Sequence, residues 1–200
     1  DYEGEGSFGE TPPPPLTALD DSGCVVHLGT FSKIIAPGVR LGYMVGPPPL
    51  IAEARAARRL MHRNVPLNNQ RTAALFVAEG HYHALRRRLR DASRARWEAA
   101  VEALERRLPE FWRSPSTSGS SLWLRCPAGV SGSVLFAEAK RQGVLLEPGE
   151  IFFATAGVGK DHFRLGLSSI PLSRIDAGIA ALAEAAEAVA RRPGRTRVAP

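Results

Sequence analysis

Short apolar segments of strand length alternate along this chain with longer stretches of helical periodicity, and this alternation constrains the fold more than any other feature. The segments expected to be strands are 24–29, 41–45, 122–125, 144–146, 150–154 and 162–167. The segments expected to be helices are 50–63, 68–79, 81–108, 133–142 and 171–191. Strands that alternate with helices indicate the α/β class, in which helices cover a sheet.

The composition is that of an ordinary globular protein, with 44% hydrophobic and 23% charged residues. No apolar run reaches the roughly 18 residues that a membrane-spanning helix needs. The two cysteines, Cys24 and Cys126, provide neither a disulfide framework nor metal-ligand spacing. The five histidines also lack a ligand pattern, so we expect no metal site. A reducing, cytoplasmic location is the expectation.

The net charge of +6 does not by itself predict a nucleic-acid-binding protein. Of the 26 basic residues, 23 are arginine, and the segment 81–108 alone carries eight arginines against four acids. A charge run of this kind on a helix is typical of a solvated face. A DNA-binding stripe is the weaker interpretation, because no helix-turn-helix, zinc finger or basic patch with interleaved aromatic residues accompanies it.

The domain organisation expected from the sequence has two parts. Residues 1–110 would form a sheet-containing part and residues 111–191 a smaller α+β part, followed by a disordered tail over 192–200. No linker composition marks the boundary, which we expect within the long helix or just after it.

The most informative segment for chemistry joins the first two expected strands. The first strand delivers Lys33 to a turn beside the hydroxyls of Thr30 and Ser32, and Arg40 follows at the start of the second strand. A lysine amine that is desolvated or close to other positive charge can form a Schiff base. Hydroxyls and a planar guanidinium are suitable donors for a phosphate. The residues alone leave open whether Lys33 is catalytic or an ordinary exposed lysine, and whether Arg40 is simply solvated.

The segment 28–47, LGTFSKIIAPGVRLGYMVGP, resembles the lysine motif of the fold type I pyridoxal-phosphate (PLP) aminotransferases of class I/II. The chain as a whole more closely resembles the aminotransferase-like domain of MocR-type regulators, a branch of the GntR family of transcription factors. Further matching segments are 1–5 (DYEGE), 147–153 (EPGEIFF) and 163–170 (FRLGLSSI). The resemblance implies the α/β fold of that class: the end of the PLP-binding large domain, within residues 1–110, followed by the small subdomain.

The resemblance also implies residue roles. Lys33 would hold PLP as a Schiff base and later move a proton. Tyr2 would hydrogen-bond the phenolic oxygen of the cofactor, while Thr30, Ser32 and Arg40 would bind its phosphate. Arg164 would bind the α-carboxylate of an amino-acid ligand as a bidentate pair. Without the resemblance, Arg164 is interpreted as a surface ion-pair residue of an arginine-rich chain.

The chain also departs from the family pattern. Asp1 matches the second of two aspartates, so we expect the carboxylate that pairs with the pyridine nitrogen to precede residue 1. The phosphate-binding glycine- and serine-rich loop and the aromatic residue that stacks on the cofactor ring are not found either. We therefore expect a C-terminal portion of a longer protein, with an incomplete large domain.

Three hypotheses remain open at the level of the sequence. The first is the PLP-binding domain of a regulator that senses an amino acid, with DNA bound only through an upstream winged-helix domain that this chain lacks. The second is a stand-alone aminotransferase that acts on an amino acid and a 2-oxo acid. The third is an inactive, truncated piece. The resemblance further implies a homodimer, with residues 50–70 as the candidate contact.

Overall fold

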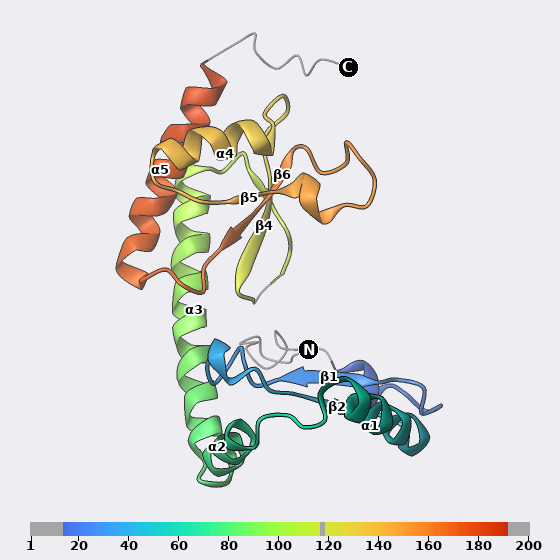
Figure 1. The fold of residues 1–200 in the computed structure, drawn as a ribbon. Coiled ribbons are helices and arrows are strands. Elements are labelled where there is room, and N and C mark those ends of the chain that lie inside the picture. Colours follow the sequence, from blue (N-terminus) through green and yellow to red (C-terminus); the bar gives the residue numbers. More distant parts are fainter. Residues whose placement is uncertain (1–13, 117–118, 192–200) are drawn as a thin grey trace. The chain divides into compact units, whose positions relative to one another are not determined.

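The structure is a computed structural model, which describes residues 14–116 and 119–191. The chain divides into two compact units between Ala92 and Ser93, inside a long helix (Figure 1). The sequence placed the division within this helix or just after it, with the first part ending at residue 110. The expected tail, 192–200, lies outside the described residues.

The first unit contains a two-stranded antiparallel hairpin. Strand β1 (His27–Thr30) pairs with β2 (Gly42–Val45), and Gly29 lies opposite Tyr43. Both strands were predicted, although β1 is shorter than the expected segment 24–29. The connection between them contains a single turn of 3₁₀ helix, η3 (Pro37–Val39).

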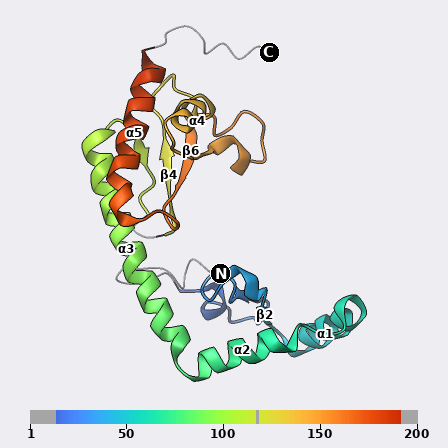
Figure 2. The same cartoon turned by 60° about the vertical axis from the view of Figure 1, so that its left-hand side comes forward.

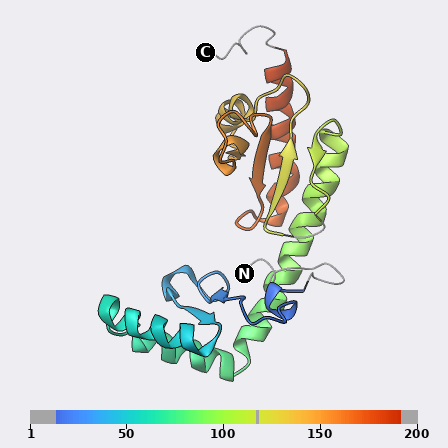
Figure 3. The ribbon, with the colours of Figure 1, turned by 90° about the vertical axis from the view of Figure 1, so that its right-hand side faces the viewer.

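Two helices follow the hairpin, and a third begins after them. They are α1 (Pro48–His62), α2 (Leu67–Ala78) and α3 (His81–Arg107), which confirm the three helices expected from the sequence within about two residues at each end. Prolines precede α1 and α2, as is common at helix starts. Gly80 adopts a φ of +79° between α2 and α3 and allows the chain to turn there. Figure 3 shows α1 beside the hairpin.

The second unit is a four-stranded antiparallel sheet in the order β3-β4-β6-β5. The strands are β3 (Trp112–Arg113), β4 (Ser121–Arg125), β5 (Glu147–Pro148) and β6 (His162–Gly166). Alternate residues of β4 and β6 are buried, namely Leu122, Leu124, Phe163 and Leu165. Side chains of a strand alternate between its two faces, so these four belong to one face, and the intervening residues form the other.

Helices cover the buried face of this sheet. They are α4 (Gly132–Arg141), α5 (Leu172–Ala190) and the second half of α3 (Figure 2). The helical residues buried in this core are Trp97, Ala100, Ala103, Leu104, Leu135, Ala139, Ile175, Ile179, Leu182, Ala185 and Ala186. Their spacing is that of helix faces turned toward a core. Within the described ranges, no helix has both the length and the apolar character to span a membrane.

Polar contacts also connect the second half of α3 to the rest of the second unit. The Nε of Arg96 donates a hydrogen bond of 2.7 Å to the carbonyl of Ile170. Arg106 and Arg107 both pair with Asp176 on α5. The hydrogen bond from Arg107 is the main cause that lowers the pKa of the Asp176 carboxyl. By contrast, the first half of α3 carries exposed arginines, as expected of a solvated face (Arg86, Arg87, Arg88, Arg90 and Arg94).

Two strand predictions in the second unit were wrong. Residues 144–146 are not a strand, and β5 begins only at Glu147. Residues 150–154 were expected to be a strand, but Gly149–Phe152 form a 3₁₀ turn, η4. The apolar run there is exposed, with Ile151 at 69% and Phe152 at 48% of full exposure, so its hydrophobicity does not mark a buried strand.

Candidate functional site

The loop that carries Lys33 is fixed at its base by hydrogen bonds between the two ends of the hairpin. The backbone N–H of Phe31 donates to the carbonyl of Leu41 at 2.9 Å. The Thr30 hydroxyl accepts from the Ser32 N–H at 3.2 Å and donates to the Leu41 carbonyl at 3.5 Å. Ser32 is buried, whereas the next residue, Lys33, is exposed. The exposed side chain of Lys33 thus extends from a loop whose base is fixed by hydrogen bonds.

Arg40 closes the same loop from the other side. It has a left-handed backbone conformation (φ 47°, ψ 40°) directly after η3. The Asn69 side-chain amide donates to the carbonyl of Val39 at 2.9 Å, which ties α2 to the residue before Arg40. Arg40 is exposed and makes no hydrogen bond or ion pair to any residue that the structure describes. Four predicted site residues, Thr30, Ser32, Lys33 and Arg40, therefore share one closed loop.

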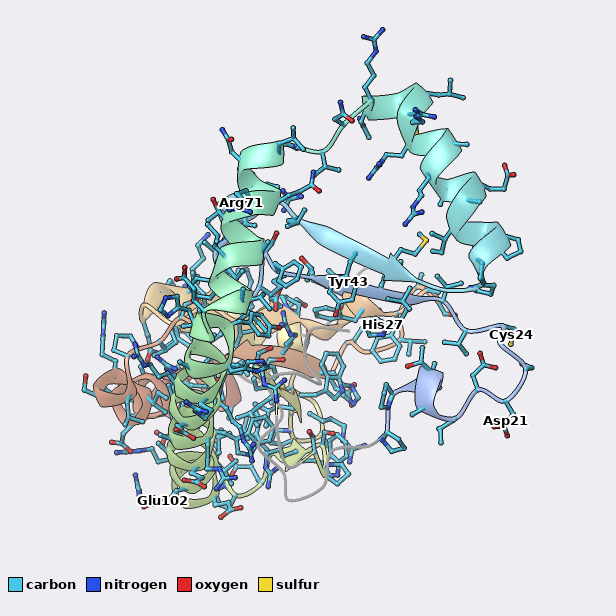
Figure 4. The ribbon with its side chains drawn as sticks, turned by 90° about the horizontal axis from the view of Figure 1, so that it is seen from below. Asp21, Cys24, His27, Tyr43, Arg71 and Glu102 are labelled. Carbon is cyan, nitrogen blue, oxygen red and sulfur yellow. The ribbon has the colours of Figure 1, made fainter. Side chains whose placement is uncertain are left out.

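Aromatic side chains pack against the hairpin behind this loop. Tyr43 stacks on His27 at a ring distance of 5.7 Å and lies 5.6 Å from Phe31. Figure 4 labels Tyr43 and His27 on the hairpin. Phe31 in turn contacts Tyr82 at the start of α3, at 5.9 Å. The Tyr43 ring lies directly over Gly29, where an added Cβ would be 2.1 Å from Tyr43 Cζ. A side chain at position 29 would therefore force the Tyr43 ring to move.

Tyr2, predicted to bind the cofactor, lies outside the described residues. Its role stays a prediction.

Arg164, the predicted carboxylate-binding residue, lies in the second unit at the centre of β6. Its Cα partners are Trp123 on β4 and Glu147 on β5. Its Nε donates to the Ser121 hydroxyl at 3.0 Å, and its Nη1 donates to Glu147 Oε2 at 2.5 Å. The Arg164 side chain is 32% exposed and lies on the face of the sheet opposite to the core. The guanidinium is therefore accessible and held by two neighbouring strands.

An aromatic cluster lies next to Arg164 on the same face. We call Trp123, His162, Phe152 and Phe153 the aromatic wall. Trp123 stacks on His162 at 5.5 Å and contacts the rings of Phe152 and Phe153 at 5.5 and 6.1 Å. His162 also pairs with the Asp161 carboxylate at 2.7 Å.

The sequence did not single out Ser121, Glu147 or the aromatic wall as site residues. The alternation along 121–125 and 162–166 could have indicated that Ser121, Trp123, His162 and Arg164 share a face. The pairing of Glu147 with Arg164 depends on the strand order, which no local pattern reveals.

Neither cysteine extends the candidate site. Burial, with a contribution from Asp161, raises the pKa of the Cys126 thiol to about 12. The thiolate is the nucleophilic form of cysteine, so Cys126 is inert at neutral pH. Cys24 is exposed and lies in the loop before β1, next to the Ser22 hydroxyl at 3.0 Å (Figure 4).

The chain is similar to two kinds of curated protein. It is 42% identical over 185 residues to the HTH-type transcriptional regulator TauR of Rhodobacter capsulatus, a match of 92% of this chain and 38% of the relative. It is 32% identical over 183 residues to the aromatic-amino-acid aminotransferase 1 of Thermococcus litoralis, a match of 90% of this chain and 43% of that enzyme. The chain thus spans less than half the length of these relatives. No protein-family model matches it.

The fold of the chain is similar to that of solved aminotransferase structures. The kynurenine aminotransferase of Pyrococcus horikoshii, solved in complex with PMP, matches with a TM-score of 0.85 and 33% identity, over 92% of this chain and 46% of that one. The multiple substrate aminotransferase of Thermococcus profundus matches with a TM-score of 0.87 and 29% identity, over 96% of this chain and 48% of that one.

Proposed function

We propose that this chain functions as the PLP-binding, aminotransferase-like domain of a transcriptional regulator. It has the fold of the fold type I aminotransferases, and its relatives include MocR-type regulators as well as aminotransferases. In this proposal Lys33 binds PLP as a Schiff base, and Arg164 binds an amino-acid ligand. The observation that carries the proposal is the closed loop in which Thr30, Ser32, Lys33 and Arg40 occur together.

The donors of this loop fit the chemical groups of PLP. The cofactor offers an aldehyde and a phosphate, and when bound it supplies an electron sink at the ligand's Cα. The exposed Lys33 amine is the group that can react with the aldehyde. The Arg40 guanidinium, which has no partner among the described residues, and the hydroxyls of Thr30 and Ser32 are donors for the phosphate. Lys33 would then also hold or move the proton at the ligand's Cα.

Arg164 suits the carboxylate of an amino acid or a 2-oxo acid. A guanidinium recognises a carboxylate by two parallel hydrogen bonds, and the side chain of Arg164 is partly exposed on an open sheet face. The backbone of β6 is held between two neighbouring strands, so the guanidinium is carried by a rigid element. This support distinguishes Arg164 from the arginines on the exposed half of α3.

The regulator is favoured over a stand-alone aminotransferase because the regulator TauR shares more identity with the chain than the aromatic-amino-acid aminotransferase does, 42% against 32%. The aminotransferase is the second candidate, because solved structures that match the chain in fold are named as such enzymes. A regulator would act as a homodimer and would bind DNA through a separate HTH domain.

Borohydride trapping tests the proposed cofactor site. We expect that PLP added to the chain, reduced with borohydride and mapped by peptide mass spectrometry, leaves a pyridoxyl group on Lys33. Lys33→Ala should abolish the adduct, whereas Lys160→Ala, a matched control in the second unit, should retain it. An adduct distributed over Lys140 and Lys160 with none on Lys33 would contradict the proposal.

A second measurement separates the two candidates. Turnover of an amino acid with a 2-oxo acid by the loaded protein would identify an aminotransferase. A pyridoxyl adduct on Lys33 without turnover, accompanied by amino-acid binding, is the result expected of a regulator.

A further inference from the structure

Arg164 already has a carboxylate partner within the chain. Glu147 lies opposite it on the edge strand β5, and Glu147 Oε2 accepts a hydrogen bond of 2.5 Å from Arg164 Nη1. Nothing else in the described ranges accepts from the guanidinium except the Ser121 hydroxyl, which binds Nε. The positive charge of Arg164 is thus paired with the negative charge of Glu147 on the neighbouring strand.

The position of this ion pair makes it easy to open. The side chains of Arg164 and Glu147 are 32% and 47% exposed, and pairs that water can reach contribute little net stability. The contact between Arg164 and Ser121 involves a different nitrogen, so it can persist when Glu147 moves away. Ser121 can therefore keep the guanidinium on the sheet face during an exchange of carboxylates.

We propose that Glu147 competes with the ligand for Arg164 and so sets how strongly a carboxylate binds there. This inference rests on the proposed function, in which Arg164 is the carboxylate-binding residue. An incoming carboxylate either displaces Glu147 or shares the guanidinium with it. In both cases the negative charge at position 147 weakens binding, because two like charges close together repel each other.

As a consequence, the affinity of Arg164 for a carboxylate is moderate, because Glu147 competes for the guanidinium. A ligand must offer more than its carboxylate to bind well, such as contacts to the aromatic wall. A simple carboxylate ion would bind weakly, because Glu147 is held beside Arg164 by the sheet and the ion has no further contact that offsets this competition. Glu147 thus acts as a specificity-determining residue through its effect on Arg164.

The experiment is an NMR titration of the full 200-residue chain with 3-phenylpropionate, which carries one carboxylate and one ring. Amide shifts of β5 and β6 report binding, and 3-phenylpropanamide is the uncharged control ligand. Glu147→Gln removes the negative charge with little change in shape. Glu150→Gln is the matched control variant, because it removes one negative charge from the same segment, and Glu150 forms no ion pair with Arg164 among the described residues.

We expect Glu147→Gln to tighten 3-phenylpropionate binding about fivefold, the effect of relieving a partly exposed like-charge contact, and Glu150→Gln to change it less than twofold. The amide ligand should bind all three proteins alike. Glu147→Asp, whose shorter side chain keeps the charge, should behave like the unchanged protein or lie between it and Glu147→Gln. Unchanged or weaker carboxylate binding in Glu147→Gln would overturn the inference.

Arg164→Gln separates the inference from the proposed function. If this variant loses 3-phenylpropionate binding while Glu147→Gln has no effect, Arg164 binds carboxylates and only the competition by Glu147 is wrong. If Arg164→Gln binds the probe as well as the unchanged protein does, both the carboxylate role of Arg164 and the competition are wrong. The Lys33 adduct is measured independently of either result.

Discussion

The two units of the molecule differ sharply in how much of their apolar surface is buried. Among the described residues, every buried hydrophobic residue except Ala73 belongs to the second unit. The first unit exposes large apolar side chains on both the hairpin and the helices, such as Met44, Leu60 and Leu67. A two-stranded hairpin alone is marginally stable in water. Arg164 thus belongs to a unit with its own core, whereas Lys33 belongs to a unit held by hydrogen bonds and a few ring contacts.

The Lys33 loop and Arg164 therefore depend on different interactions for their positions. Arg164 stands on a sheet whose opposite face contains Phe163 and Leu165, both inside the core. Lys33 depends on the backbone bonds at the base of its loop and on Tyr43 and Phe31 behind it. Apolar burial offsets the entropy that folding costs, so the second unit should be the more stable one.

The largest expected effect tests this difference in burial directly. Leu182→Ala, at a fully buried position on α5, should lower the free energy of unfolding of the second unit by about 2–5 kcal/mol, because it leaves a cavity in the core. Leu60→Ala, the same change at a 90% exposed position on α1, should alter stability by less than about 0.5 kcal/mol.

Urea denaturation provides the measurement. All three tryptophans lie in the second unit and all three tyrosines in the first, so the two fluorescence signals report on different units. Equal losses in the two variants would break the comparison. A single midpoint shared by both signals would show that the units unfold together.

The Lys33 loop could be predicted from the sequence because its residues are contiguous. Local patterns within residues 24–45 predict the two strands and the turn between them. The same segment contains all four residues of the loop, Thr30, Ser32, Lys33 and Arg40. The surroundings of Arg164 could not be predicted in this way. Ser121, Glu147 and Arg164 come together only because β4, β6 and β5 are neighbours in one sheet. Strand order is set by the packing of the whole unit and leaves no trace in a short segment.

The wrong prediction of a strand at residues 150–154 has a related cause. Its apolar run contributes the exposed rings of Phe152 and Phe153 to the aromatic wall instead of to the core. A pattern of hydrophobic residues cannot distinguish a buried strand from an apolar surface beside a candidate site.

Gly29→Ala should change stability by an intermediate amount, and it tests the ring packing that supports the Lys33 loop. The added methyl group would collide with the Tyr43 ring, so the variant should be destabilised by about 1–3 kcal/mol, as measured by the tyrosine signal in urea. Gly38→Ala, in the connection between β1 and β2, is the control, because an added Cβ meets no atom within 4 Å there. Similar behaviour of the two variants would show that Tyr43 does not hold the hairpin in place.

The smallest expected effect concerns the segment that leads into β1, and it depends on pH. The Asp20 carboxylate accepts hydrogen bonds from the Val25 N–H at 2.7 Å and from the Ser22 hydroxyl at 2.8 Å. These bonds, with that of Val25 the strongest cause, lower the pKa of Asp20 to about 2 from its usual 3.8. Because the pKa is depressed in the folded state, Asp20 stabilises the fold above about pH 4, and this contribution disappears as the pH falls toward 2.

Asp20→Asn should therefore reduce the stability of the first unit slightly at neutral pH, and this effect should diminish as the pH falls from 4 through about 2. Tyrosine-detected urea midpoints between pH 2 and 7 would measure the difference. Asp21→Asn, which removes the same charge one residue later, is the control and should show no such pH dependence. A constant difference across the pH range would mean that the Asp20 hydrogen bonds do not contribute through its charge. The conformation of the segment before β1 would then not depend on the charge of Asp20.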